Sequence, residues 1–144
     1  MAVPHLGADL LPPQQQTLRS SAVFTGIGLH TGRRARVVVE PAPPDHGLVF
    51  VTGGARIPAL SEYVGDTTRC STLMSGNTVI HTVEHLLAAL YGLGVDNAEI
   101  HIDGPEPPAM DGSALPFAEG LLAAGIEQQG RPARQVRLRE IVWV

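Results

Sequence analysis

The chain has 144 residues, of which 44% are hydrophobic and 17% charged, so it is long enough for one domain with a core and is not disordered by composition. The formal net charge is −4 and the densest basic stretch is Arg33-Arg34-Ala35-Arg36, which gives no support to nucleic-acid binding. A single cysteine, Cys70, excludes an internal disulfide and is typical of a reducing compartment, and no apolar run approaches the roughly 20 residues of a membrane span.

The first residues differ in character from the rest of the chain. Residues 1–15 contain three prolines and the beginning of a run of three glutamines, and we expect a disordered leader. They carry neither a basic start nor an apolar stretch, so they do not read as a signal peptide. Residues 16–144 are predicted to form one domain.

Extended segments dominate the first half of that domain. Residues 23–32 predict a strand that ends in a glycine-punctuated turn. Residues 36–40 and 48–52 are rich in β-branched side chains and flank a proline-rich turn, so we expect them to pair as a hairpin. Further extended segments are predicted at 55–60, 69–74 and 78–80, the last two flanking the tight-turn sequence Ser75-Gly76-Asn77.

Two helices are predicted in the second half. The first covers residues 82–91, because its apolar side chains recur at spacings of three and four and glycines follow it. The second follows Ser113 as its cap and ends at Gly125, with an inner face made of Phe117, Leu121, Leu122 and Ala124. Strands are expected at 97–102 and 136–144. The order predicts an α+β fold with two layers, a mixed or antiparallel sheet packed against two helices.

The segment with the strongest chemical signal is His81-Thr82-Val83-Glu84-His85. If both histidines lie on one helix face, four residues apart, they can hold one metal ion together, and H-x-x-E-H is the pattern of inverted-zincin metallopeptidases with the glutamate as base. The alternative is that His81 is a strand-to-helix junction residue. No third ligand for a peptidase is evident further along the chain.

Four other residues admit a functional and a structural interpretation. His30 lies in a glycine-bracketed turn and could project into a site or be an exposed turn histidine. Asp111 could be a site carboxylate or a turn former, Cys70 a small buried hydrophobe, and Glu106 a solvated loop charge between prolines. The pair Gly26 and Gly28 lacks the third glycine of a nucleotide-binding loop, which argues against that function.

Several longer motifs occur together and in order. They are Gly26-Ile27-Gly28-Leu29-His30-Thr31-Gly32, Thr82-Val83-Glu84-His85-Leu86, Gly92-Leu93-Gly94-Val95-Asp96-Asn97, Pro105-Glu106-Pro107-Pro108-Ala109-Met110-Asp111-Gly112-Ser113 and Phe117. Through these segments, over about residues 16–144, the chain resembles the zinc-dependent UDP-3-O-acyl-N-acetylglucosamine deacetylases of lipid A biosynthesis.

The resemblance implies a reaction and site residues. Water at a zinc ion attacks the acetamide carbonyl of the UDP-linked, 3-O-acylated sugar, and acetate and a free amine result. Glu84 matches the general base, His85 a zinc ligand, and Asp111 a carboxylate that supports the catalytic groups. His30 matches a position near the mouth of the site, and Cys70 one in the substrate region. His81 has no ligand role in the family.

Two features depart from the family pattern. Thr68-Arg69 replaces the usual apolar neighbours of Cys70, which bears on contact with the acyl chain. The resemblance also implies a two-domain β-α-α-β sandwich of which this chain matches the N-terminal half, so the remaining Zn²⁺ ligands are expected from a C-terminal half in cis or in trans.

Three functions therefore stand side by side. The resemblance implies a cytoplasmic deacetylase that acts on a UDP-linked acylated glucosamine, incomplete in this chain alone, with no nucleic acid or membrane span as partner. A second possibility is a non-catalytic remnant or binding module of the same fold. A third is a small inverted-zincin metallopeptidase that uses His81, Glu84 and His85.

Overall fold

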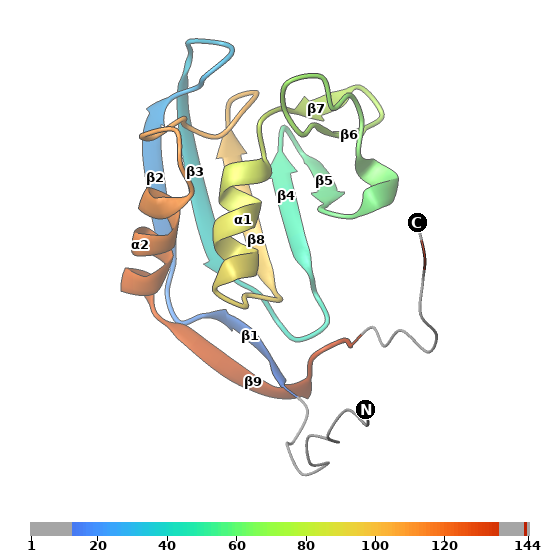
Figure 1. Ribbon diagram of the computed structural model, residues 1–144, viewed down its shortest axis with the longest axis vertical. Helices are drawn as coiled ribbons and strands as arrows, with labels where there is room; N and C mark the ends of the chain where they lie inside the picture. The colour runs from blue at the N-terminus through green and yellow to red at the C-terminus, as the bar shows by residue number, and fades with distance from the viewer. Residues whose placement is uncertain (1–12, 136–142, 144) are drawn as a thin grey trace.

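The centre of the protein is a five-stranded mixed sheet with the strand order β2-β3-β8-β4-β5 (Figure 1). The computed structural model describes residues 13–135 and 143. Its elements are β1 (Gln14–Leu18), β2 (Ala22–Ile27), β3 (Arg34–Pro41), β4 (Leu48–Thr52), β5 (Ala55–Pro58), a 3-10 turn η1 (Ser61–Tyr63), β6 (Leu73–Ser75), β7 (Thr78–Ile80), α1 (Glu84–Gly92), β8 (Ala98–Asp103), α2 (Leu115–Ala124) and β9 (Ile126–Pro132).

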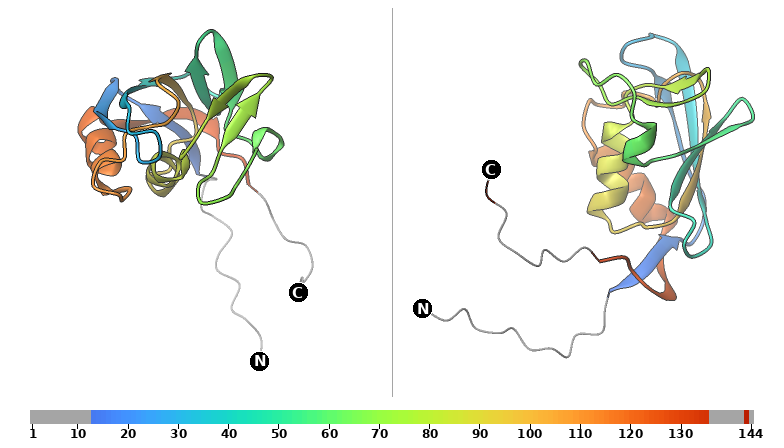
Figure 2. Two further views of the ribbon diagram at one scale, coloured as in Figure 1. Left: turned by 90° about the horizontal axis from the view of Figure 1, so that it is seen from above. Right: turned by 90° about the vertical axis from the view of Figure 1, so that its right-hand side faces the viewer.

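Both helices lie on one face of this sheet, which gives the predicted two-layer α+β architecture (Figure 2). The strands alternate to suit it: in β8, Ile100 and Ile102 are buried while His101 between them is partly exposed. The core between the layers includes Leu86 and Leu90 of α1. Burying side chains of this kind contributes about 1.5–3 kcal/mol each, so the helix layer holds the sheet together.

The second helix is packed through its aromatic residue. Phe117 of α2 meets Phe24 of β2 edge to face, with ring centroids 5.0 Å apart and an interplanar angle of 63°. Leu121 is fully buried, as predicted, but Leu122 is 57% exposed. The predicted inner face was therefore one residue too wide, because successive helix residues point about 100° apart and the buried stripe follows Phe117 and Leu121.

The predicted hairpin between residues 36–40 and 48–52 is wrong. Strand β8 lies between β3 and β4, antiparallel to β3 and parallel to β4. The hairpins that form are β2 with β3 and β4 with β5. A central strand buried on one face offers its hydrogen bonds to either neighbour, so local alternation alone does not name its partners.

A small separate sheet pairs β1 with β9 antiparallel across the lower edge of the molecule (Figure 1). Strand β1 begins at Gln14, so residues 14 and 15 are ordered and do not belong to a disordered leader. Strand β9 was not predicted, and the strand expected at 136–144 lies outside the described residues, apart from Trp143. Both strands of this sheet are rich in polar side chains, which is why the hydrophobic pattern missed them.

The first helix begins two residues later than predicted. Thr82 has a φ of +57°, in the left-handed region that β-branched residues avoid, and the helix runs from Glu84 to Gly92. The turn sequence at residues 75–77 joins β6 and β7 as expected. Within the part of the chain that the structure describes, neither helix has the length and apolar character needed to cross a membrane.

Candidate functional site

Both helices begin at the same end of the molecule, and the loops with the predicted site residues gather there. The β2–β3 turn, the β6–β7 hairpin and the loop between β8 and α2 all lie at the upper end in Figure 1. The fold thus brings together loops that are far apart in the sequence, between about residues 26 and 113. This end of the fold is the candidate site.

Glu84 is the first residue of α1, where the helix dipole favours a negative charge. It is partly buried, and its Oε2 accepts a hydrogen bond of 2.9 Å from the backbone N–H of Ser71. The backbone carbonyl of Ser71 in turn accepts the N–H of Val83 at 3.2 Å. The loop before β6 therefore fixes the orientation of the carboxylate, as a general base requires.

His85 follows directly and is partly buried. Asp111, in the loop before α2, is exposed, and its Oδ1 accepts hydrogen bonds from the N–H and the hydroxyl of Ser113 at 2.9 and 2.8 Å. Those bonds from Ser113 lower the pKa of Asp111, and the charge of His85 acts in the same direction. Two predicted site residues that are far apart in sequence thus lie within electrostatic reach of each other.

Ser113 was predicted to cap the second helix, but the N-cap position is Ala114, which makes no side-chain cap hydrogen bond. The hydroxyl of Ser113 nevertheless accepts the backbone N–H of Leu115, the first residue of α2, at 3.1 Å. The Asp111–Ser113 pair therefore joins the candidate site to the beginning of α2.

His30 lies in the β2–β3 turn with an exposed side chain, and its backbone N–H donates to Glu106. Glu106 is fully buried, so the prediction of a solvated loop charge is wrong. Burial raises the pKa of Glu106, but hydrogen bonds from Thr31, His30 and Thr82 outweigh it, and the pKa lies below its usual range. The flanking prolines stiffen the loop that carries Glu106, but its burial depends on partners that only the folded chain brings together.

Cys70 and His81 are connected through one threonine. The Cys70 sulfur lies 3.7 Å from the Thr72 hydroxyl, and that hydroxyl lies 3.3 Å from Nδ1 of His81. Cys70 is partly exposed, not a fully buried hydrophobe. His81 precedes α1, so it and His85 do not share a helix face. The alternative in which the two histidines form a ligand pair on one helix does not hold, and His81 is the strand-to-helix junction residue.

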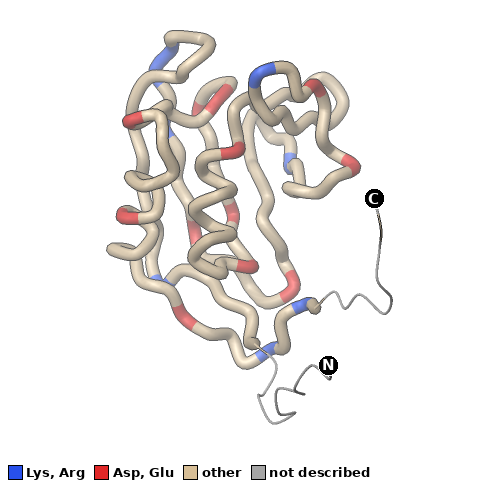
Figure 3. The backbone as a smooth tube through the Cα atoms, viewed as in Figure 1, with Lys and Arg blue, Asp and Glu red and all other residues tan. Residues whose placement is uncertain are grey.

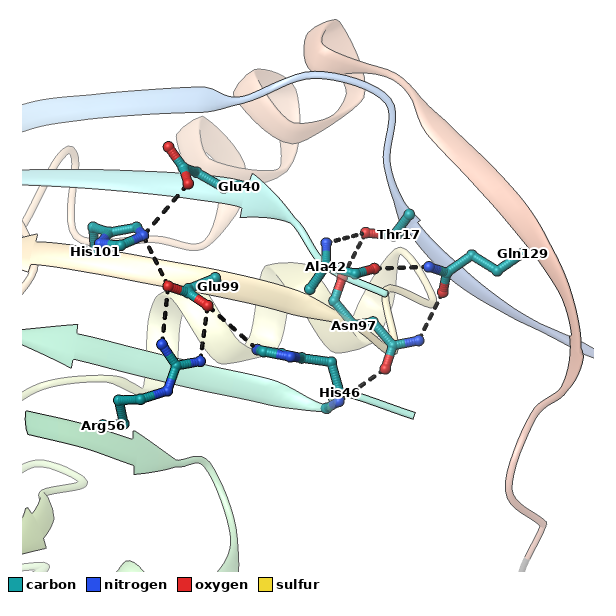
Figure 4. A network of polar contacts seen from close by, with 10 residues as sticks. Thr17, Glu40, Ala42, His46, Arg56, Asn97, Glu99, His101 and Gln129 are labelled. Atoms are coloured by element: carbon teal, nitrogen blue, oxygen red, sulfur yellow. Dashed lines mark hydrogen bonds and ion pairs between the residues drawn. The ribbon is translucent and has the colours of Figure 1, made fainter. Parts of the chain in front are cut away.

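A second polar cluster lies on the open face of the sheet, away from both helices (Figure 4). The carboxylate of Glu99 accepts hydrogen bonds from both terminal nitrogens of Arg56, at 3.1 and 2.8 Å. Its Oε1 also lies 3.2 Å from Nε2 of His101. The hydrogen bonds from Arg56 hold the pKa of Glu99 below its usual range. Figure 3 shows acidic and basic positions interspersed along the described backbone.

Within residues 13–135 and 143, no three His, Cys, Asp or Glu side chains are grouped so that they could hold a metal ion. A catalytic zinc site needs about three protein ligands. The described residues contribute His85 from the expected set, so they do not by themselves fit a complete zinc site.

The fold and the site define an α+β domain with an adjacent acid and histidine, Glu84 and His85, in the first turn of a helix. The sequence profile described as LpxC, UDP-3-O-acyl N-acetylglycosamine deacetylase, matches residues 15–144, and the chain belongs to that family. The metallopeptidase interpretation is therefore not supported.

Individual relatives agree with the profile. The chain is 48% identical over 134 residues to UDP-3-O-acyl-N-acetylglucosamine deacetylase of Myxococcus xanthus, covering 90% of this chain and 43% of the relative. It is 46% identical to the deacetylase of Legionella pneumophila, covering 91% and 44%, and 46% identical to the bifunctional enzyme LpxC/FabZ of Chlorobaculum tepidum, covering 89% and 28%. The chain thus spans less than half the length of the relatives it matches.

Proposed function

We propose that this chain forms part of a zinc-dependent amide hydrolase that removes the N-acetyl group of UDP-3-O-acyl-N-acetylglucosamine in lipid A biosynthesis. The observation that carries the proposal is the Glu84–His85 pair at the start of α1, oriented by Ser71, in a chain whose residues 15–144 match the deacetylase family. A carboxylate held by a backbone N–H at a helix N-terminus is suited to accept a proton from an attacking water.

Each site residue has a role in this proposal. Glu84 takes a proton from the water whose oxygen bonds to the acetamide carbonyl carbon. The bond from that carbon to the sugar nitrogen then breaks, the proton passes to the nitrogen, which leaves as the free amine, and the acetyl group leaves as acetate. Asp111, held by the N–H and the hydroxyl of Ser113 in the loop before α2, is proposed to support the catalytic groups by hydrogen bonding. His30 and Cys70 lie on loops at the same end of the fold, where they would contact the substrate.

We infer that His85 is one ligand of the zinc ion. When bound there, zinc would polarise the carbonyl and acidify water. The further ligands would come from the part of the longer relatives that this chain does not span, joined to it in cis or supplied in trans. We propose that this missing part is the main protein partner of the chain, beside the UDP-linked substrate. We place the reaction in the cytoplasm, because the substrate is a nucleotide-linked precursor.

The test is a chimera in which this chain replaces the matching segment of the Myxococcus xanthus relative, assayed for acetate release from the UDP-sugar. We expect turnover, and we expect Glu84→Gln to lower kcat by about 10²–10⁴-fold with little change in KM. Glu119→Gln, on the exposed surface of α2, is the matched control and should be unaffected. An unchanged kcat in Glu84→Gln would show that Glu84 is not the base.

A binding module without catalysis is the second candidate. It is favoured by the lack of a three-ligand group among the described residues. It predicts that the chain alone binds the UDP-sugar in the absence of zinc and that His85→Ala leaves this affinity unchanged. Loss of binding on chelation or in His85→Ala would exclude it.

A further inference from the structure

The most deeply buried charge near the site is the carboxylate of Glu106, whose residue is 0% exposed. It lies in the stiff loop between β8 and α2, flanked by Pro105 and Pro107. A buried carboxylate is expensive unless strong hydrogen-bond donors surround it. The hydrogen-bond donors around this carboxylate therefore identify the segments that it holds together.

Those partners come from two separate segments of the candidate site. Oε1 accepts the backbone N–H groups of His30 at 3.0 Å and Thr31 at 2.6 Å, and Oε2 accepts the Thr82 hydroxyl at 3.0 Å. Among the described residues, none of the ion pairs involves Glu106. One buried carboxylate thus joins the β2–β3 turn to Thr82, two residues before the start of α1.

Thr82 needs such a restraint. Its φ of +57° is strained for a β-branched side chain, and conformations of this kind persist only when the surroundings hold them. It lies two positions before Glu84 and three before His85. Any relaxation of Thr82 would therefore rotate the first turn of α1, which carries both.

The sequence around the carboxylate is built to admit it. A Cβ at position 28 would overlap the side chain of Glu106, and one at position 26 would lie 2.9 Å from Cβ of Pro108. The Gly26 and Gly28 pair, which resembled part of a nucleotide loop, thus serves close approach of this loop. The N–H of Ala109 also donates to the carbonyl of Ile27 at 2.8 Å, which closes the same contact.

We propose that Glu106 is a positioning residue, which through Thr82 sets the orientation of Glu84 and His85 and through His30 fixes the turn at the edge of the site. The inference rests on the proposed function for its catalytic meaning. Its structural content, the coupling between Glu106 and Glu84, stands without it. Ser71 offers a direct reporter, because its N–H donates to Glu84.

The test is backbone amide hydrogen exchange on the full 144-residue chain, with β8 amides as the internal reference. Thr82→Val keeps the branched shape and the strain but removes the hydroxyl, and Thr82→Ser keeps the hydroxyl. We expect Thr82→Val to speed exchange at Ser71 by about tenfold or more relative to β8, because hydrogen bonds to a charged group are worth that much. Thr82→Ser should behave as the parent chain.

Glu106→Gln should weaken both the contact with the β2–β3 turn and the contact with Thr82, so amide exchange should become faster at His30, Thr31 and Ser71 together. The exposed control Glu119→Gln should change none of these rates. If Thr82→Val left Ser71 protection unchanged, or changed it only in step with the β8 amides, the coupling to Glu84 would be refuted. Because Thr82→Val retains the buried carboxylate and its bonds to the turn, this result does not depend on Glu106→Gln folding.

The chimera supplies the catalytic readout. We expect Thr82→Val to lower the kcat of the chimera by about tenfold or more while its KM stays within a factor of about two. Thr82→Ser should restore the parent kcat. A loss confined to KM would overturn the positioning role. If the parent chimera had no deacetylase activity while the exchange pattern held, the proposed function would fail and the structural coupling would stand.

Discussion

The carboxylate of Glu84 accepts the backbone N–H of Ser71 at 2.9 Å, across 13 positions of the chain. This contact links the loop that carries Cys70 to the first turn of α1. A backbone N–H is uncharged, so this hydrogen bond fixes the orientation of the carboxylate without pairing it with a positive charge, as the proposed role of Glu84 as a base requires.

The contact predicts different effects for two substitutions of Glu84. Glu84→Ala leaves the Ser71 N–H without its acceptor in a partly buried place, and we expect a loss of about 1–3 kcal/mol in the free energy of unfolding. Glu84→Gln keeps an acceptor oxygen and should lose less than half of that. Urea denaturation of both variants measures the difference. Equal losses would show that the bond does not contribute to stability.

The edge-to-face pair of Phe24 and Phe117 predicts the most sensitive point of the core. Phe117 is 1% exposed, and Phe117→Ala should destabilise the fold by about 3–5 kcal/mol through lost burial and a cavity. Leu122→Ala, on the same helix but 57% exposed, should change stability by less than about 0.5 kcal/mol. Thermal or urea unfolding checks both, and a large loss at Leu122 would contradict the observed helix face.

Buried amides fasten the terminal sheet to the body of the domain. Asn97 is 1% exposed, accepts the Gly47 N–H at 2.8 Å and donates to Gln15 and Gln129 at 2.9 and 2.7 Å (Figure 4 shows the Asn97–Gln129 contact). Asn97→Ala leaves several buried polar groups without a hydrogen-bond partner. We expect a loss of about 2–4 kcal/mol in the free energy of unfolding, with increased amide exchange in β1 and β9. Gln128→Ala, exposed in β9, is the control and should be nearly neutral.

The ion pair on the open sheet face predicts a pH effect with a definite sign. Hydrogen bonds from Arg56 hold the pKa of Glu99 below its ordinary value, so the folded state binds the proton less tightly than the unfolded state. The stabilisation is complete above the ordinary carboxyl pKa and is lost as the pH falls through the lowered value. We expect Arg56→Gln to raise the Glu99 pKa, as followed by carboxyl carbon NMR, and to flatten this acid-side loss. An unmoved titration would show that Arg56 does not set it.

Local pattern was sufficient for the elements that have a buried apolar face and insufficient for the pairing of the strands. The alternation in residues 98–103 and the spacing in α1 follow from one buried face each, and both were predictable. The insertion of β8 between β3 and β4 was not, because alternation fixes the face and not the neighbour. Strands β1 and β9 were missed because side-chain amides such as Gln15, with partners more than 80 positions away, hold them in place of an apolar stripe.

The candidate site shows the same division. Glu84 and His85 stand out in the sequence because adjacent acid and imidazole groups before an apolar run are uncommon. Glu106 does not, because only the folded chain brings its carboxylate to the turn at His30 and to Thr82. The helical pairing of His81 with His85 failed for a related reason: the positive φ of Thr82 delays the helix until Glu84.

Metal binding gives the last prediction. Among the described residues, His85 has no grouped companions that could complete a metal site, and a lone imidazole binds zinc weakly. We therefore expect calorimetric titration of the metal-free 144-residue chain with Zn²⁺ to give only weak binding, at least a hundredfold weaker than that of the chimera. His85→Ala should abolish stoichiometric zinc in the chimera and should change the weak binding of the chain alone very little. Tight one-to-one binding by the chain alone would instead mean that it assembles a site by itself, with ligands beyond the described residues or from a second copy, and the proposal that the remaining ligands come from the longer relatives' additional length would be wrong.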